Sequence, residues 1–194
     1  MLKICHRINT IDQLQKIHPS QGIEVDLHAH GKRLVVNHDA FVDAVDFEEW
    51  LLHYRNPFLI LNIKEEGIEN RVLELVLKYN IDDFFLLDLS FPALIKLVKV
   101  KEKRVAIRVS HYESFETAIR IAGEAEWVWL DLFFDELPIN KNQYQLLRKY
   151  GYKICLVSPE LHGRSNQSII RVQSLLRANQ VAVDAVCTKY PDLW

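Results

Sequence analysis

Side chains that could carry out chemistry gather near the N-terminus of the sequence. Two histidines, His6 and His38, lie on either side of two carboxylates, Glu24 and Asp26. Two histidines that flank a phosphate can act as general base and general acid, because the pKa of imidazole lies near neutrality. We therefore expect His6 and His38 to be the catalytic pair in the cleavage of a phosphodiester; the alternative is that each is a hydrogen-bonded structural histidine.

Glu24 and Asp26 are two residues apart on a predicted strand, so their side chains should point the same way. Two carboxylates in one cavity repel each other, and their pKa values rise unless a cation lies between them. A hard divalent ion such as Mg²⁺ or Ca²⁺ prefers oxygen ligands of this kind. The pair predicts a divalent-metal site; the alternative is a network of ion pairs with Arg7, Lys64 or Arg108.

Four further side chains are candidates to bind the substrate: Arg7, Lys64, Arg108 and His162. Arginine binds phosphate oxygens through two parallel hydrogen bonds, whereas lysine acts as a point charge. Arg7 and Lys64 are expected to hold the phosphate. His162 lies in a polar loop that could contact the leaving group; the alternative is that this loop is only a polar turn.

A competing signal comes from His28 and His30, which are separated by one residue. His-x-His on a strand places two imidazoles on one face, as in zinc-dependent hydrolases. The run 26–30 is similar to the opening of the polymerase-and-histidinol-phosphatase family, but here a full strand–helix unit precedes it. A zinc hydrolase therefore stays an alternative, alongside the simpler interpretation that a strand runs out into a polar loop.

Short apolar runs alternate with amphipathic segments along the whole chain. Several runs are continuously apolar, as in parallel strands that are covered on both faces. The expected strands are 3–5, 23–27, 58–63, 84–89, 105–109, 127–132, 153–157 and 185–188. Seven helices are expected between them, near 11–17, 46–54, 68–79, 92–98, 114–123, 144–150 and 169–176.

Eight strands and seven helices in strict alternation predict an α/β fold, a compact (β/α)₈ TIM barrel without its last outer helix. We expect one domain spanning residues 1–194, because no linker or composition shift divides the chain. Active sites of this fold lie at the C-terminal ends of the strands, where most of the candidate residues occur. The missing helix should leave one flank of the first and last strands uncovered, and a second copy of the chain is expected to cover it.

Composition excludes several other classes of protein. The net charge of −2 gives no electrostatic case for binding nucleic acid. No apolar run approaches the roughly 20 residues of a membrane helix, and no signal-peptide core is present, so we expect no membrane insertion and a cytoplasmic location. Cys5, Cys155 and Cys187 lie in apolar stretches and are expected to be buried, reduced thiols.

The ordered motifs resemble those of the glycerophosphodiester phosphodiesterases, a family of TIM barrels. In that family His-Arg-Gly is followed by Glu-x-Asp, His-Asp, Glu-x-Lys, Ser-Phe and a final Thr-Asp-x-Pro. The matching segments here are His6-Arg7-Ile8, Glu24-Val25-Asp26, His38-Asp39, Asn62-Ile63-Lys64, Ser90-Phe91 and Thr188-Lys189-Tyr190-Pro191. The match spans nearly the whole chain in the correct order.

The resemblance implies a phosphoric diester hydrolase of lipid metabolism that acts on a small, glycerophosphodiester-like substrate by metal-assisted hydrolysis or cyclising cleavage. His6 and His38 would be its acid–base pair. Glu24, Asp26 and Asn62 would bind Mg²⁺ or Ca²⁺.

Two departures from the family pattern affect these implications. The glycine after His-Arg is Ile8, so this turn is expected to differ. Where the family has a glutamate on its third strand, this chain has Asn62, which removes one negative charge. The affinity for a metal should therefore fall unless Asp88 or Asp131 contributes a ligand. A non-catalytic barrel that binds a phosphorylated ligand is therefore a second hypothesis.

Overall fold

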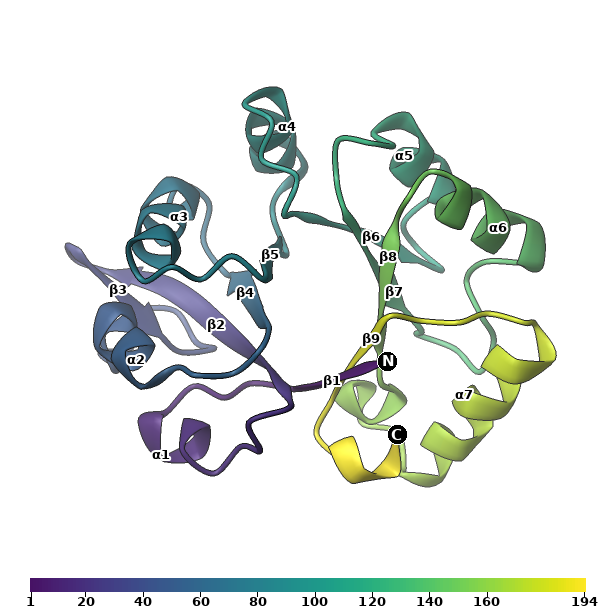
Figure 1. Ribbon diagram of the computed structural model, residues 1–194, viewed down its shortest axis with the longest axis horizontal. Helices are drawn as coiled ribbons and strands as arrows, with labels where there is room; N and C mark the ends of the chain where they lie inside the picture. Colours follow the sequence, from purple (N-terminus) through teal and green to yellow (C-terminus); the bar gives the residue numbers. More distant parts are fainter. The chain divides into compact units, whose positions relative to one another are not determined.

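The computed structural model describes residues 1–194, and the chain forms two compact units (Figure 1). The first unit is Cys5–Lys99, and the second combines Met1–Ile4 with Val100–Trp194. The organisation of residues 1–194 as a single domain stays a prediction.

The first unit contains a small sheet with helices between its parallel strands. After the end of β1 (Leu2–Cys5), its elements are α1 (Ile11–Leu14), β2 (Gly22–His30), β3 (Arg33–Val36), α2 (Phe47–His53), β4 (Leu59–Ile63), α3 (Glu69–Lys78), β5 (Phe84–Leu87) and α4 (Phe91–Lys99). Strand β2 pairs in parallel with β4, and β4 pairs in parallel with β5. Every residue of β4 and β5 is buried, which explains their continuously apolar sequences.

The second unit repeats the alternation of strand and helix. Its elements are β6 (Ala106–Ser110), α5 (Phe115–Arg120), β7 (Trp127–Asp131), α6 (Lys141–Lys149), β8 (Lys153–Val157), the short 3₁₀ helix η1 (Pro159–His162), α7 (Gln167–Ala178), β9 (Ala185–Thr188) and η2 (Pro191–Leu193). Strands β6, β7, β8 and β9 pair in parallel in this order.

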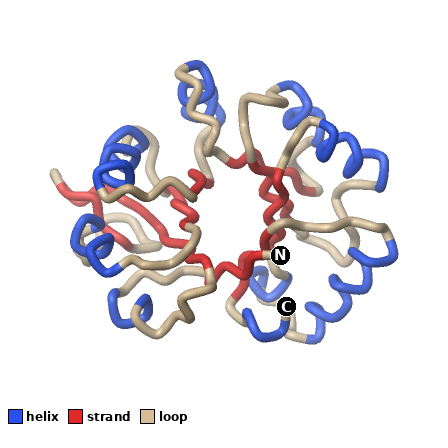
Figure 2. The backbone as a smooth tube through the Cα atoms, in the orientation of Figure 1, coloured by secondary structure: helices blue, strands red, loops and turns tan.

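The predicted (β/α)₈ barrel fold is confirmed. All eight predicted strands and seven predicted helices occur in the expected order, and their alternation can be followed along the tube in Figure 2. Within residues 1–194, only the 3₁₀ turn η2 follows the last strand. No helix is long and apolar enough to cross a membrane.

Local sequence signals explain where several helices begin. The side chain of Asp46 accepts a hydrogen bond from the Glu48 N–H at the start of α2, as the predicted N-cap requires. Ser114 caps α5 in the same way, and Pro92 lies in the first turn of α4. The three cysteines are buried thiols, as predicted.

One strand was missed, and its neighbour was predicted too short. Strand β2 continues to His30, three residues beyond the expected end, and turns at Gly31 into β3, with which it pairs antiparallel. The apolar residues of β3 are buried. The interpretation of His28 and His30 as a polar loop is therefore wrong, because a hairpin gives both residues backbone partners.

The expected uncovered flank is not found at the last strand, whereas Leu2 and Lys3 of β1 are half-buried. All four residues of β9 are buried. The C-terminal segment is held in place by two hydrogen bonds, from the Trp194 indole to Ser158 Oγ at 2.8 Å and from Gln173 Nε2 to the Leu193 carbonyl at 2.8 Å. A second copy of the chain as a partner stays a prediction, now without this argument.

The carboxylate of Asp184 contributes to the stability of the second unit in a way that can be tested. Its carboxylate accepts two hydrogen bonds from Arg148, at 2.5 and 3.1 Å, and one from the Ile154 N–H at 2.7 Å. Partial burial disfavours the charged carboxylate, but these donors outweigh burial and lower the pKa of Asp184. A lowered pKa means that the stabilisation is complete above the unfolded-state pKa and disappears as the pH falls through the folded-state value.

We predict that Asp184→Asn lowers the free energy of unfolding by about 1–2 kcal/mol at pH 7 and by much less near pH 3. Urea denaturation at the two pH values measures this difference. Asp82→Asn, at an exposed position, is the control and should change stability little at either pH. An equal loss at both pH values would contradict the role assigned to the Asp184 charge.

Candidate active site

The pairing of β2 with β4 brings two carboxylates and an amide together. Glu24 and Asp26 lie two residues apart on β2 and are both buried, and Asp26 is opposite Asn62 in the parallel register. Asn62 Nδ2 donates to Glu24 Oε1 at 2.9 Å and to Asp26 Oδ1 at 3.1 Å. The prediction that both carboxylates share one face is confirmed, and the amide bridges them.

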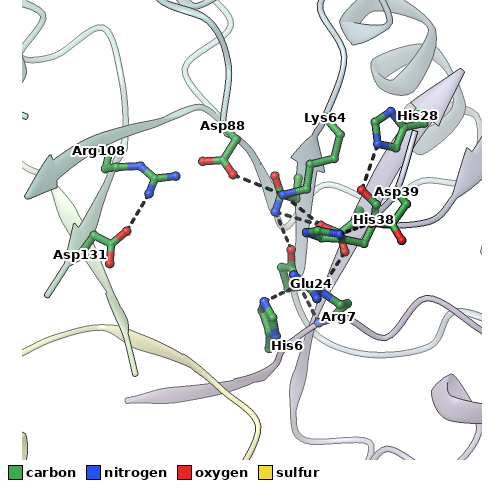
Figure 3. A network of polar contacts seen from close by, with 12 residues as sticks. His6, Arg7, Glu24, His28, His38, Asp39, Lys64, Asp88, Arg108 and Asp131 are labelled. Carbon is green, nitrogen blue, oxygen red and sulfur yellow. Dashed lines mark hydrogen bonds and ion pairs between the residues drawn. The ribbon is translucent and has the colours of Figure 1, made fainter. Parts of the chain in front are cut away.

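Three other side chains donate to Asp26 or form ion pairs with it. Lys64 Nζ lies 3.3 Å from Oδ1, whereas Arg7 Nε lies 3.4 Å and Asn9 Nδ2 2.8 Å from Oδ2. Figure 3 shows Arg7 and Lys64 near Glu24, with Asp88 beyond Lys64. Sequence reasoning missed Asn9, because no motif or periodicity marks a residue in an irregular loop. We call the six residues Arg7, Asn9, Glu24, Asp26, Asn62 and Lys64 the carboxylate cluster.

Glu24 is the more strongly perturbed of the two carboxylates. Its Oε2 accepts a hydrogen bond from the Arg7 backbone N–H at 2.6 Å, and His6 Nε2 lies 3.9 Å from the same oxygen. Burial, followed by repulsion from Asp26, raises the pKa of Glu24 to about 7, although Asn62 and Lys64 oppose the rise. The rise expected for paired carboxylates is therefore present at Glu24.

The turn after β1 adapts to the missing glycine. Arg7 takes the left-handed conformation, with φ at 59°, and the buried Ile8 donates its N–H to the Glu24 carbonyl at 2.9 Å. Left-handed backbone is unfavourable for a residue with a Cβ and is retained where surrounding contacts impose it. Here the contacts of Arg7 with Glu24 and Asp26 hold the turn.

Lys64 links two carboxylates from neighbouring strands. Besides its contact with Asp26, its Nζ lies 3.6 Å from Asp88 Oδ2, just after β5. Asp88 also has left-handed backbone, with φ at 57°. This contact accounts for the position of Asp88, which the sequence had offered as a substitute metal ligand.

His38 belongs to a dyad with its neighbour Asp39. It follows β3, the antiparallel strand of the hairpin, and not the end of a parallel barrel strand as expected. Its Nδ1 lies 2.8 Å from Asp39 Oδ1, and the His38 carbonyl accepts a hydrogen bond from His28 Nε2 at 3.2 Å. Because an ionised carboxylate can only accept, Asp39 holds the proton of His38 on Nδ1 and leaves Nε2 to exchange a proton.

His28 and His30 have separate partners. His28 Nδ1 lies 3.8 Å from Glu65, and His30 Nδ1 lies 3.6 Å from Asp43. Neither unit contains a group of three or more His, Cys, Asp or Glu side chains that could hold a metal ion. The hairpin contacts instead give His28 a structural role, since it fixes the backbone of His38.

The second unit brings together the other two predicted substrate contacts. Asp131, at the end of β7, is buried and bonds to Arg108 Nη1 at 2.6 Å and to His162 Nε2 at 2.5 Å. The ring of Phe133 lies 4.7 Å from that of His162. Asp131 therefore positions Arg108 and His162, and its two oxygens are each engaged by one of them.

The chain was compared with known proteins in sequence and in structure. No protein-family model and no curated protein sequence matches it. Its fold is similar to a glycerophosphodiester phosphodiesterase from Agrobacterium tumefaciens, with a TM-score of 0.67, 17% identity and coverage of 100% of this chain and 99% of that chain. The fold is also similar to a glycerophosphoryl diester phosphodiesterase from Parabacteroides distasonis, with a TM-score of 0.67 and 11% identity. This match covers 99% of this chain and 84% of that chain.

A structure from Galdieria sulphuraria gives a TM-score of 0.68 at 19% identity and covers 99% of this chain and 95% of that chain. Likeness at these identities establishes the fold along the whole chain. The barrel predicted from strand periodicity and the barrel of these phosphodiesterases are thus the same fold.

The amide bridge between the two carboxylates can be tested by stability measurements. Replacing Asn62 with leucine leaves Glu24 and Asp26 buried with one donor fewer each. We predict that Asn62→Leu lowers the free energy of unfolding by about 2–4 kcal/mol, because buried charges without partners are costly. Chemical denaturation at pH 7 measures the loss. Asn142→Leu, at an exposed position on α6, should cost far less; similar losses would argue against the bridge.

Proposed function

We propose that the chain is a phosphoric diester hydrolase that cleaves a small, glycerophosphodiester-like substrate with two histidines as acid and base. One observation carries the proposal. His6, Arg7 and Lys64 surround the buried pair Glu24 and Asp26 in the first unit, on the fold of known glycerophosphodiester phosphodiesterases. The order of these residues in the sequence matches the pattern of the same family.

The phosphate group would bind to Arg7 and Lys64. The Arg7 side chain is 42% exposed and that of Lys64 is 21% exposed, so both can reach a ligand while their inner contacts with Asp26 hold them. Two cations would neutralise the negative charge that builds up on the phosphate oxygens in the transition state. Arg108 and His162, both bonded to Asp131 in the second unit, stay predicted substrate contacts.

Proton transfer would be divided between His6 and His38. One neutral imidazole takes a proton from water, or from a hydroxyl of the substrate, as that oxygen attacks phosphorus. The bond from phosphorus to the leaving oxygen breaks, and the other histidine, protonated, gives its proton to the leaving alkoxide. Attack by water gives a phosphomonoester and an alcohol; attack by a substrate hydroxyl gives a cyclic phosphate and an alcohol.

A divalent cation at Glu24, Asp26 and Asn62 was the expected cofactor. The donor set around these residues does not fit a cation, because the amide of Asn62 donates to both carboxylates and Lys64 and Arg7 contact the same acid. No step of the proposed mechanism therefore passes through a metal.

A second candidate function is the binding of a phosphorylated ligand without turnover. The replacement of the family's strand-three glutamate by Asn62 favours it, because a catalytic component would then be missing. Titration with glycerol 3-phosphate separates the candidates: saturable binding in a protein that cleaves no phosphodiester supports the binding function, whereas cleavage supports the hydrolase.

We predict that His6→Ala and His38→Ala each lower kcat/KM at least 100-fold on a glycerophosphodiester, as expected for loss of a general acid or base. Release of the alcohol, measured with excess EDTA and with added Mg²⁺ or Ca²⁺, provides the assay. His53→Ala, at an exposed position on α2, is the matched control and should keep wild-type activity. Full activity in either of the first two variants would refute the proposed acid–base pair.

A further inference from the structure

We propose that the Asn62 amide takes the place of a metal ion between Glu24 and Asp26, so that this site works without a divalent cation. The consequence of this replacement for catalysis rests on the proposed function. The absence of metal binding at Glu24 and Asp26 does not depend on the proposed function. The hydrogen-bonding capacity of the two carboxylates, the orientation of the amide and the nearby positive charges all support it.

The carboxylate of Asp26 has no capacity left for a metal. An ionised carboxylate has about four lone-pair positions, two on each oxygen. Oδ1 faces Asn62 Nδ2 at 3.1 Å and Lys64 Nζ at 3.3 Å, whereas Oδ2 faces Asn9 Nδ2 at 2.8 Å and Arg7 Nε at 3.4 Å. A cation could bind Asp26 only by displacing at least one of these four donors.

Glu24 also has a protein donor on each of its oxygens. Its Oε1 accepts from Asn62 at 2.9 Å and its Oε2 accepts from the Arg7 N–H at 2.6 Å. The second of these is a backbone group, which cannot move aside as a flexible side chain can. A metal between the two acids would therefore have to displace a donor of Asp26 and share the oxygens of Glu24 with these two donors.

The orientation of Asn62 follows from the same contacts. Its NH₂ group has two hydrogens, one for each carboxylate, and satisfies both. If the amide were turned over, its oxygen would face two carboxylate oxygens at about 3 Å and repel them. A glutamate at this position has no hydrogens to donate and would need a cation between the three acids, which asparagine does not.

Charge balance favours the same conclusion. Lys64 and Arg7 already place two positive charges beside Asp26, and Lys64 also pairs with Asp88. A divalent ion bound to Asp26 would lie next to the Lys64 ammonium, which contacts the same oxygen, and would be repelled by it. The two side chains that would bind the phosphate thus also provide the charge that a metal would otherwise supply.

The direct test is isothermal titration calorimetry of the wild-type protein with CaCl₂ and, separately, with MgCl₂. We expect no saturable binding below about 1 mM, the weak end of protein calcium sites. The melting temperature should be the same in EDTA and in excess CaCl₂, because a ligand that does not bind the native state cannot stabilise it.

Two variants should create the missing site. Asn62→Asp keeps the shape of the side chain, and Asn62→Glu lengthens it; both replace the amide donor with a third carboxylate. We expect each to bind Ca²⁺ at least 10-fold more tightly than the wild type and to gain about 2–4 °C in melting temperature on adding CaCl₂. Asn70→Asp adds the same charge at an exposed position on α3 of the first unit and should show neither effect.

Two results would overturn the proposal. One is saturable Ca²⁺ or Mg²⁺ binding to the wild type that Glu24→Gln abolishes. The other is failure of both Asn62 variants, folded by circular dichroism, to bind either ion, since the amide would then not be what keeps a metal out.

Activity provides a separate readout. If the protein cleaves a phosphodiester, cleavage should continue at an unchanged rate in EDTA; loss in EDTA with recovery in Mg²⁺ or Ca²⁺ would refute metal independence. Absence of cleavage under every condition would refute the proposed function alone, because the binding and melting measurements need no turnover.

Discussion

Burying a carboxylate costs several kcal/mol, roughly, unless donors surround it, and β2 buries two of them on one face. Several polar groups of the first unit compensate for this burial. The turn at Arg7, the amide of Asn62 and the ammonium of Lys64 all point at Glu24 or Asp26. None of these donors is close in sequence to the acid that it serves, so the compensation exists only in the folded state.

The pairing of β2 with β4 is therefore the constraint on which the site depends. Asp26 faces Asn62 because the register places them opposite each other, and Glu24 shares that face because side chains alternate along a strand. A slip of one residue in either strand would send Asn62 to the other face and leave both acids without it. The apolar residues that alternate with these polar ones, Val25 and Leu61, are fully buried and hold the register.

Periodicity in the sequence was enough to predict the fold, because parallel strands in an α/β barrel are apolar on both faces and contrast clearly with amphipathic helices. It failed at β3, where the strand is short and the preceding hairpin carries histidines that look like loop residues. Periodicity also gave no sign of how the C-terminal segment is held, because the bonds of Trp194 to Ser158 and of Gln173 to Leu193 follow no local pattern.

The candidate site was predictable in its residue types but not in its bonding. The two-residue spacing predicted that Glu24 and Asp26 share one face of a strand. The order of the motifs predicted that Lys64 and Arg7 lie near them. Whether Asn62 presents its oxygen or its nitrogen to the acids is decided by three-dimensional neighbours, and Asn9 gave no signal at all. Likewise, the sequence paired His38 with Asp39 but could not show that His28 holds the backbone between them.

The division of the chain at Lys99 has an evolutionary consequence. Every member of the carboxylate cluster is encoded in one continuous stretch, whereas Arg108, Asp131 and His162 belong to the other unit. Mutations in the second half can reshape the surroundings of Asp131 while the long-range pairing that compensates the buried acids is inherited intact.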